Sequence, residues 1–330
     1  MRWAMKARHL PLLALLWVSA AAGQTALAPP HFHHLALNAT DPDAAIAFFL
    51  KEFPSTTRTD WEGMPALESP THAMIAFQKA GAPPPADPDI TAYWHFGWSV
   101  PDSRKSLEIF RGQNLLVPFY TDDQGDYVGT SSDTYPYPPG IPGRTKTQIA
   151  EAAAQKLEPR RIGGNGYIFG PDHAIVEFTG NSPERFDHVH MWQDDPLCAQ
   201  FWYVSHLQAT PRRGTAPITG ENCRMPRGTD PSWPSLNRKG TYRSPTGGVS
   251  FDDVAMNWYM NQTEKPLAPT LGHLIDHVSL AVGDLDAWIA KLKGEGVVFL
   301  RQPYRIGSTR AVMIEGPSHE AIELVETGGP

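Results

Sequence analysis

The stretch "HVSLAVGDLDAWIAKL" (277–292) has the pattern of a strand followed by that of a helix. Hydrophobic residues alternate from Val278 to Val282, as in a strand that is buried on one face. From Asp284 onward, apolar residues recur at helical spacing. Aspartate at such a junction is a good helix N-cap, because its carboxylate accepts hydrogen bonds from the free amides of the first turn. The stretch therefore predicts a strand, a capped turn and a helix.

The same frame occurs three more times along the chain. "HLALNATDPDAAIAFF" begins at His34, "HFGWSVPDSRKSLEIF" at His95 and "HVHMWQDDPLCAQFW" at His188. In every copy an aspartate follows the histidine by seven positions; the four are Asp41, Asp102, Asp195 and Asp284. Since side chains alternate across a strand, each histidine should lie on the face opposite the apolar face that packs under the helix.

Two later strands carry a glutamate in a shared context. "GPDHAIVEF" (170–178) and "GPSHEAIEL" (316–324) place Glu177 and Glu323 six positions after a proline. In each case apolar residues flank the glutamate, so its side chain should also project away from the apolar face. Only the second and fourth units have such a strand, which predicts two pairs of consecutive units.

With these residues, the chain resembles the vicinal oxygen chelate superfamily, which includes glyoxalase I, bleomycin and fosfomycin resistance proteins and extradiol dioxygenases. The resemblance implies an α+β fold of four βαβββ modules, paired into two cupped mixed β-sheets with helices on the outer face. Pairing of consecutive modules gives an N-terminal domain over residues 31–182 and a C-terminal domain over residues 183–330.

The resemblance also implies metal ligands. The superfamily uses a histidine on the first strand of one module, with a histidine and a glutamate on the first and last strands of its partner. Applied to this sequence, the ligand pattern of the superfamily implies a main set of His188, His277 and Glu323. It implies a second set of His34, His95 and Glu177. Such ligands suit a divalent metal, namely Fe, Mn, Zn or Ni, without deciding among them.

Neighbouring histidines are alternatives to two of these ligands. His190 lies two residues after His188 and should share its face, where it could assist or be a spare. His33 stands directly before His34, so the same alternation predicts that it points the other way.

The implied function is a metal-dependent enzyme that acts on a small oxygenated molecule by bidentate chelation. Glyoxalase-like lyase or isomerase chemistry and dioxygenase-type chemistry both fit, and the catalytic residues stay open. The tyrosine of the extradiol signature has a counterpart in Tyr167, but Met313 replaces it in the last module. The alternative is a metal-free protein of the same fold that binds and sequesters a small molecule.

The N-terminal residues 1–23 have the pattern of a signal peptide. Arg2, Lys6 and Arg8 precede an apolar run that ends in small residues. We therefore expect a periplasmic or secreted protein with no membrane anchor after cleavage. Cleavage would move the formal net charge from −7 to −10, because three basic residues and no acidic ones are lost. This charge argues against nucleic acid as a partner and leaves a small-molecule substrate, bound by a monomer or homodimer.

The chain has two cysteines, Cys198 and Cys223. In an oxidising compartment they could form one disulfide that closes a short loop. Two separate buried thiols are the alternative, and the sequence does not decide between them.

Overall fold

The computed structural model describes residues 27–86, 91–117, 120–121, 127–129, 143–145, 154–155, 165–180, 182–212, 217–224, 247–261 and 266–327. The predicted signal peptide, residues 1–23, lies outside this part of the chain. Among the helices that are described, none is both long and apolar enough to cross a bilayer.

The four predicted units are present, and we number them as modules 1 to 4. Module 1 comprises β1 (His31–Ala39), α1 (Pro42–Glu52), β2 (Thr57–Trp61), β3 (Met64–Glu68) and β4 (Met74–Lys79). Module 2 comprises β5 (Tyr93–Val100), α2 (Ser103–Gly112), β9 (Asn165–Phe169), the short helix η1 (Pro171–His173) and β10 (Ile175–Gly180). Between α2 and β9, a separate small sheet contains β6 (Tyr120–Thr121), β7 (Tyr127–Gly129) and β8 (Gly143–Thr145). Module 3 comprises β11 (Arg185–Gln193), α4 (Pro196–Leu207), β12 (Thr210–Pro211), β13 (Gly247–Phe251) and β14 (Val254–Met260). Module 4 comprises β15 (Ile275–Val282), α5 (Leu285–Gly294), β16 (Phe299–Ile306), β17 (Thr309–Glu315) and β18 (Ala321–Glu326).

The repeated aspartates stand at the N-caps of the four helices. The carboxylates of Asp41, Asp102 and Asp284 accept hydrogen bonds from first-turn amides of their helices. Asp195 occupies the same position with the same extended backbone, but its side chain makes no capping hydrogen bond. The local frame read from the sequence is thus present in every copy, although one of the caps lacks its side-chain contact.

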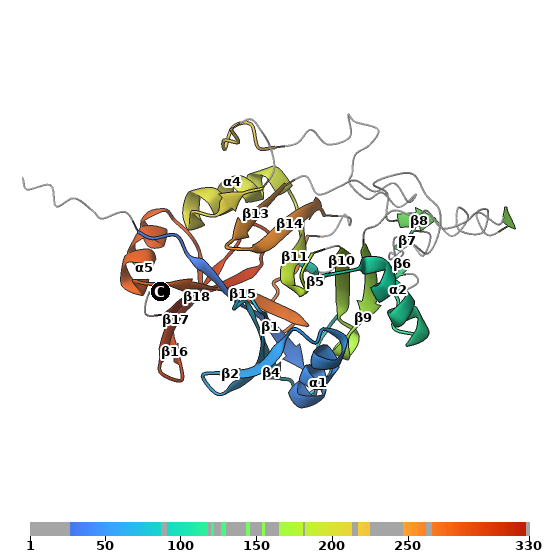
Figure 1. Cartoon of the computed structure of the whole chain (residues 1–330). Coiled ribbons are helices and arrows are strands. Elements are labelled where there is room, and N and C mark those ends of the chain that lie inside the picture. Colours follow the sequence, from blue (N-terminus) through green and yellow to red (C-terminus); the bar gives the residue numbers. More distant parts are fainter. Residues whose placement is uncertain are drawn as a thin grey trace, which may run out of the picture.

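The strands form two mixed sheets, and this confirms the α+β fold class (Figure 1). The first sheet has eight strands in the order β16-β17-β18-β15-β1-β4-β3-β2, so it combines modules 4 and 1. The second sheet has seven strands in the order β12-β13-β14-β11-β5-β10-β9 and combines modules 3 and 2. The predicted pairing of module 1 with module 2 and of module 3 with module 4 is therefore wrong, because each sheet takes strands from both sides of the boundary between 31–182 and 183–330.

The lengths of the connections between modules explain this pairing. Residues 181–184 alone join β10 to β11, so module 3 stays in the same sheet as module 2. The connections 80–92 and 261–274 are much longer, and each carries the chain from one sheet to the other. Modules 1 and 2 instead meet through a helix: the ring of Phe49 in α1 stacks on Trp98 of β5 with centroids 5.2 Å apart.

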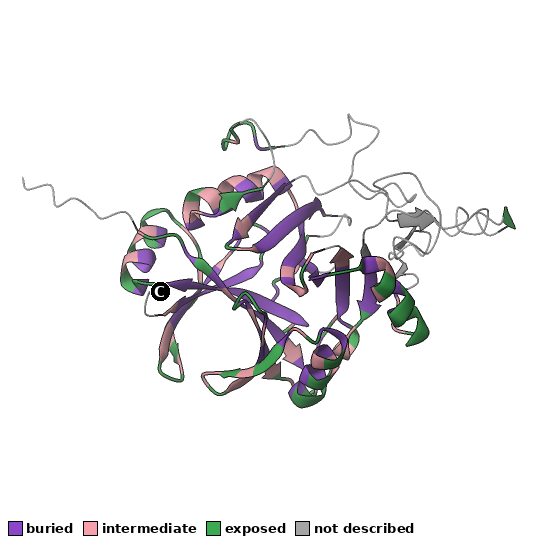
Figure 2. Ribbon diagram, in the orientation of Figure 1, coloured by how far each residue is buried: buried purple, intermediate pink, exposed green. Residues whose placement is uncertain are grey.

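The first sheet is curved, so that its edge hairpins approach each other (Figure 1). Glu62, at the tip of β2–β3, accepts hydrogen bonds from the amide and hydroxyl of Ser308 and the hydroxyl of Thr309 at the tip of β16–β17. Figure 2 shows that the inner strands of both sheets are buried, whereas the helices are exposed along one side. The curvature and the buried strands together create an enclosed face for polar side chains.

Cys198 of α4 and Cys223 form a disulfide, which decides between the two alternatives that the sequence left open. Replacing both cysteines by serine should lower the free energy of unfolding by about 3 kcal/mol, because the bond restricts the unfolded chain. Urea denaturation of the oxidised protein and of the double variant measures this difference. The reduced wild-type protein is the control and should match the variant; equal stability of all three would contradict the prediction.

Candidate metal centres

The histidines and glutamates singled out from the sequence lie in two buried clusters. The first centre consists of His34, His277 and Glu323, and the second of His95, Glu177, His188 and His190. Within each centre, every residue offers one donor atom, and these atoms all lie within 4.8 Å of one another. All six predicted ligands belong to these clusters, and their binding of metal stays a prediction.

The grouping of the ligands differs from the predicted one. His34 joins His277 and Glu323, and His188 joins His95 and Glu177. The two predicted sets are not brought together, because β1 pairs with β15 and β11 pairs with β5. Each centre still has a histidine from one module and a histidine and glutamate from its partner, as the resemblance implies.

The first centre is almost completely shielded from solvent. Its three residues are at most 4% exposed. Glu323 Oε2 lies 3.8 Å from His34 Nε2 and 3.6 Å from His277 Nε2. Within the described part of the chain, His34 Nε2 and Glu323 Oε2 have no hydrogen-bond partner. Such unpaired buried atoms are uncommon, and three converging donors of this kind fit a bound metal ion.

Two neighbours orient the ligands of the first centre. Asp276 Oδ1 accepts a hydrogen bond from His277 Nδ1 over 2.7 Å, which leaves His277 Nε2 directed at the centre. Tyr304 donates its hydroxyl proton to Glu323 Oε1, so that Oε2 is the oxygen that faces the histidines. Contacts of this kind fix the tautomer and orientation of metal ligands in proteins.

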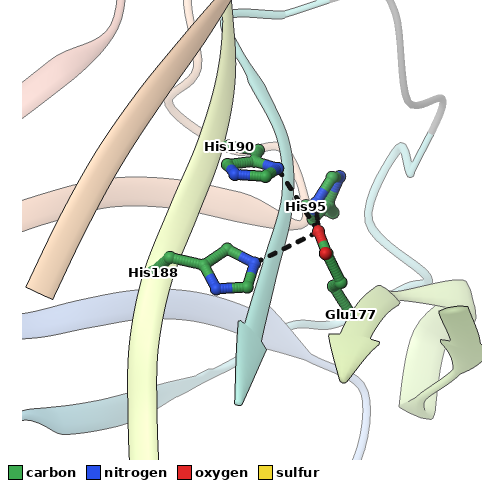
Figure 3. A group of neighbouring side chains, drawn as sticks. All are labelled: His95, Glu177, His188 and His190. Carbon is green, nitrogen blue, oxygen red and sulfur yellow. Dashed lines mark hydrogen bonds and ion pairs between the residues drawn. The ribbon is translucent and has the colours of Figure 1, made fainter. Parts of the chain in front are cut away.

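The second centre converges on one carboxylate oxygen (Figure 3). Glu177 Oε2 lies 2.7 Å from His95 Nε2, 3.3 Å from His188 Nε2 and 3.3 Å from His190 Nδ1. Asp187 accepts a hydrogen bond from His188 Nδ1 over 2.6 Å, in the role that Asp276 has in the first centre. His95 Nδ1 and His188 Nε2 are buried with no hydrogen-bond partner among the residues described.

A β-bulge directly precedes the ligand histidine in each of the four first strands. The strand ladders skip one residue at His33, Trp94, Asp187 and Asp276. A bulge interrupts the alternation of a strand, so the skipped residue contacts the histidine that follows it. For this reason the prediction that His33 points away is wrong: its Nδ1 lies 2.7 Å from Nδ1 of His34.

The bulges also show what sequence reasoning missed. Asp187 and Asp276 both open the tripeptide Asp-His-Val, a shared signal that is visible in the sequence. Strict alternation would nevertheless have placed both carboxylates on the far face of the strand. Tyr304 lies on β16, outside every repeated motif, and nothing local marks it as a neighbour of Glu323.

The histidines that lack a carboxylate at Nδ1 are held neutral. Burial lowers the pKa of His34 well below its ordinary value, and the neighbouring His33 and His277 lower it further. Burial also lowers the pKa of His95, although the contact with Glu177 opposes this shift. A neutral imidazole is the form that binds a metal.

The histidines paired with an aspartate behave in the opposite way. Burial by itself would lower the pKa of His277, but the hydrogen bond to Asp276 and the nearby carboxylate of Glu323 outweigh it and raise the pKa to about 9. Burial of His188 is likewise outweighed, by the charges of Glu177 and Asp187, and its pKa is raised to about 10. A metal that binds at either centre would therefore release a proton.

These shifts predict a pH dependence of the metal-free protein. Both folded-state pKa values lie above the value of about 6.5 for histidine in the unfolded chain. The stabilisation that protonated His277 and His188 give to the folded state is thus fully present below about pH 6.5. It is lost as the pH rises through the folded pKa values of about 9 and 10. Urea unfolding between pH 6 and pH 10 should show falling stability, and Asp276→Asn should flatten the decline. Stability that is constant or rises across this window would contradict the prediction.

Comparison with known proteins agrees with this architecture. Residues 185–324 match the family described as the Glyoxalase/Bleomycin resistance protein/Dioxygenase superfamily. No curated protein matches the sequence. Glyoxalase I from Zea mays has a similar structure, with a TM-score of 0.56 and 15% identity over 90% of this chain and 92% of that one. A proposed dioxygenase from Bacillus subtilis has a TM-score of 0.51 and 11% identity over 91% of this chain and 86% of that one.

At these identities the solved structures establish the fold, which extends over nearly the whole described chain. The family match adds the sequence relationship for modules 3 and 4. By sequence, residues 185–324 therefore match the superfamily that the resemblance predicts, and the described chain as a whole has its fold.

Proposed function

We propose that the whole chain belongs to the glyoxalase, bleomycin resistance protein and dioxygenase superfamily and is a metal-dependent enzyme whose active site is the first centre. The observation that carries the proposal is the convergence of three buried donors from His34, His277 and Glu323. Two of these atoms have no hydrogen-bond partner in the described structure. Because unpaired buried polar atoms are costly, the arrangement favours a cation that all three residues share.

The ligand set suits chemistry on oxygen atoms. Two imidazoles and one carboxylate leave coordination positions free and suit Fe, Mn, Zn or Ni. A divalent ion held there would act as a Lewis acid toward two neighbouring oxygens of a small substrate. Asp276 and Tyr304 keep His277 Nε2 and Glu323 Oε2 directed at one point. Lyase or isomerase chemistry and dioxygenase chemistry are both compatible with this set.

The surroundings favour the first centre over the second as the place of catalysis. His33, Trp61 and Tyr304 border the first centre, and all three are partly exposed. The ring of Trp61 lies 4.5 Å from that of His34, so a partly exposed side chain covers the first centre on this side. The rings beside His95 in the second centre, those of Trp94 and Tyr167, are buried.

We further propose that the enzyme acts outside the cytoplasm, as a monomer or homodimer. The signal-peptide pattern of residues 1–23 supports export, and the net charge of −10 without them supports a small-molecule substrate rather than nucleic acid. Cell fractionation of the tagged chain tests the location. Retention in the cytoplasm at full length would contradict it.

Elemental analysis of the mature protein, purified without chelator, tests the metal. His34→Ala and His277→Ala should each remove the same metal ion, whereas His95→Ala should leave it in place. Metal-loaded protein is then assayed for oxygen uptake with catechols and for isomerisation of 2-oxoaldehyde–thiol adducts. Failure to bind Fe, Mn, Zn or Ni at the first centre even after reconstitution would contradict the enzyme and favour a metal-free binding protein of the same fold.

A further inference from the structure

The second centre has a histidine that the first centre lacks. His190 follows His188 by two positions on β11, so both side chains project from the same face. In the ladder between β5 and β11, His190 pairs with His95. In the corresponding ladder of the first sheet, Ala36 pairs with His277. His190 therefore occupies the place of an alanine and adds a donor where the first centre has a methyl group.

From this arrangement we propose that the second centre is a four-ligand metal site in which His190 Nδ1 is a ligand beside His95, His188 and Glu177. Nδ1 of His190 lies 3.3 Å from Glu177 Oε2, the oxygen on which the other two histidines converge (Figure 3). The inference rests on this cluster alone and holds whether or not the first centre is catalytic.

Asn257 fixes the ring of His190 for this role. Its amide lies beside His190 on the neighbouring strand β14, with Nδ2 3.2 Å from His190 Nε2. The other amide atom, Oδ1, is buried and has no hydrogen-bond partner in the described structure. Rotation of the amide by half a turn would let His190 Nε2–H donate to Oδ1, so that Nδ1, the nitrogen beside Glu177 Oε2, is the unprotonated one. A metal-bound histidine usually donates its second N–H to an oxygen in this way.

The four donors predict a different metal preference for the two centres. A site with three imidazole nitrogens and one carboxylate oxygen favours Zn, Cu or Ni. The first centre has only two imidazoles, and it is comparatively better suited to Mn or Fe. Four protein ligands also fill a tetrahedral Zn site, as in structural zinc centres, and leave less room for a substrate. The buried rings of Trp94 and Tyr259, 6.4 Å and 5.4 Å from that of His190, shield this side of the centre. The second centre is thus a tight, closed site for an imidazole-preferring ion.

Zinc binding to the full mature chain tests the proposal without any assay of activity. Competition with a chromogenic chelator should reveal a tight site that His190→Gln weakens by more than about 100-fold, since even loss of an outer contact of a metal ligand costs about 10–100-fold. Asn257→Leu should weaken the same site by about 10–100-fold. His34→Ala, in the first centre, should leave it unchanged. Circular dichroism confirms that each variant is folded.

X-ray absorption of the zinc-loaded His34→Ala protein provides a test that needs no change at His190. Three imidazoles around the zinc are expected, and two would overturn the proposal. An unchanged affinity of the tight site in His190→Gln would overturn it as well. The proposal is also overturned if the wild-type chain binds a single zinc ion and the His34→Ala variant loses it, because the second centre then holds no metal. Loss of metal from the first centre alone contradicts only the proposed enzyme.

Discussion

The Glu323→Ala variant should lose the metal of the first centre and at least about 10³-fold in kcat/KM on any substrate that the wild-type protein converts. The carboxylate is the only anionic donor that the first centre contains. Its removal leaves two imidazoles, which hold a divalent ion far less tightly. Lewis-acid stabilisation of the transition state is worth several kcal/mol, and each 1.36 kcal/mol changes the rate about tenfold.

Glu177→Ala is the matched control, because Glu177 has the same position in the second centre. It should release the metal of the second centre and leave the first-centre metal and most of the activity in place. Steady-state kinetics and elemental analysis of both variants make the comparison. If Glu177→Ala abolishes activity and Glu323→Ala does not, the chemistry takes place at the second centre.

The second large effect concerns folding. Expressed separately, residues 24–182 and 183–330 should each fail to form a stable monomeric domain. Separation removes the β1–β15 and β5–β11 ladders, which are the central pairings of the two sheets. Each fragment would then expose apolar strand faces and unpaired strand edges over two half-sheets.

Circular dichroism and urea unfolding measure whether each fragment folds stably. Size-exclusion chromatography detects fragments that dimerise to replace the missing partner. Co-expression of the two fragments is the control: they should copurify as one complex that unfolds cooperatively. A fragment that is monomeric and unfolds cooperatively by itself would show that modules 1 and 2, or modules 3 and 4, pair in solution, contrary to the sheet order described above.

Much of the site was predictable because its determinants are local. The strand, cap and helix of each module follow from alternation, an aspartate and helical spacing. The same alternation places each of the four histidines on the face of its strand opposite the helix; they are His34, His95, His188 and His277. His190 is a further case: its spacing from His188 predicts the shared face, and the structure places it beside Glu177.

Other parts of the site depend on contacts between distant segments. Tyr304 reaches Glu323 only because β16 and β18 lie in the same curved sheet. His33, Asp187 and Asp276 reach their histidines through bulges, which arise where two strands of unequal register pair. A rule based on a single strand places all three on the wrong face.

The sequence by itself determined the four modules and the faces on which the six predicted ligands lie, because periodicity and capping act within a few residues. Only the tertiary structure decided that modules 1 and 4 share one sheet and modules 2 and 3 the other. The modules resemble one another, so their strand edges are nearly equivalent and local patterns do not select a partner. The selection comes from the short connection at 181–184 and from helices such as α1 that pack between consecutive modules. For this reason the residues of the two centres could be named in advance, whereas their grouping could not.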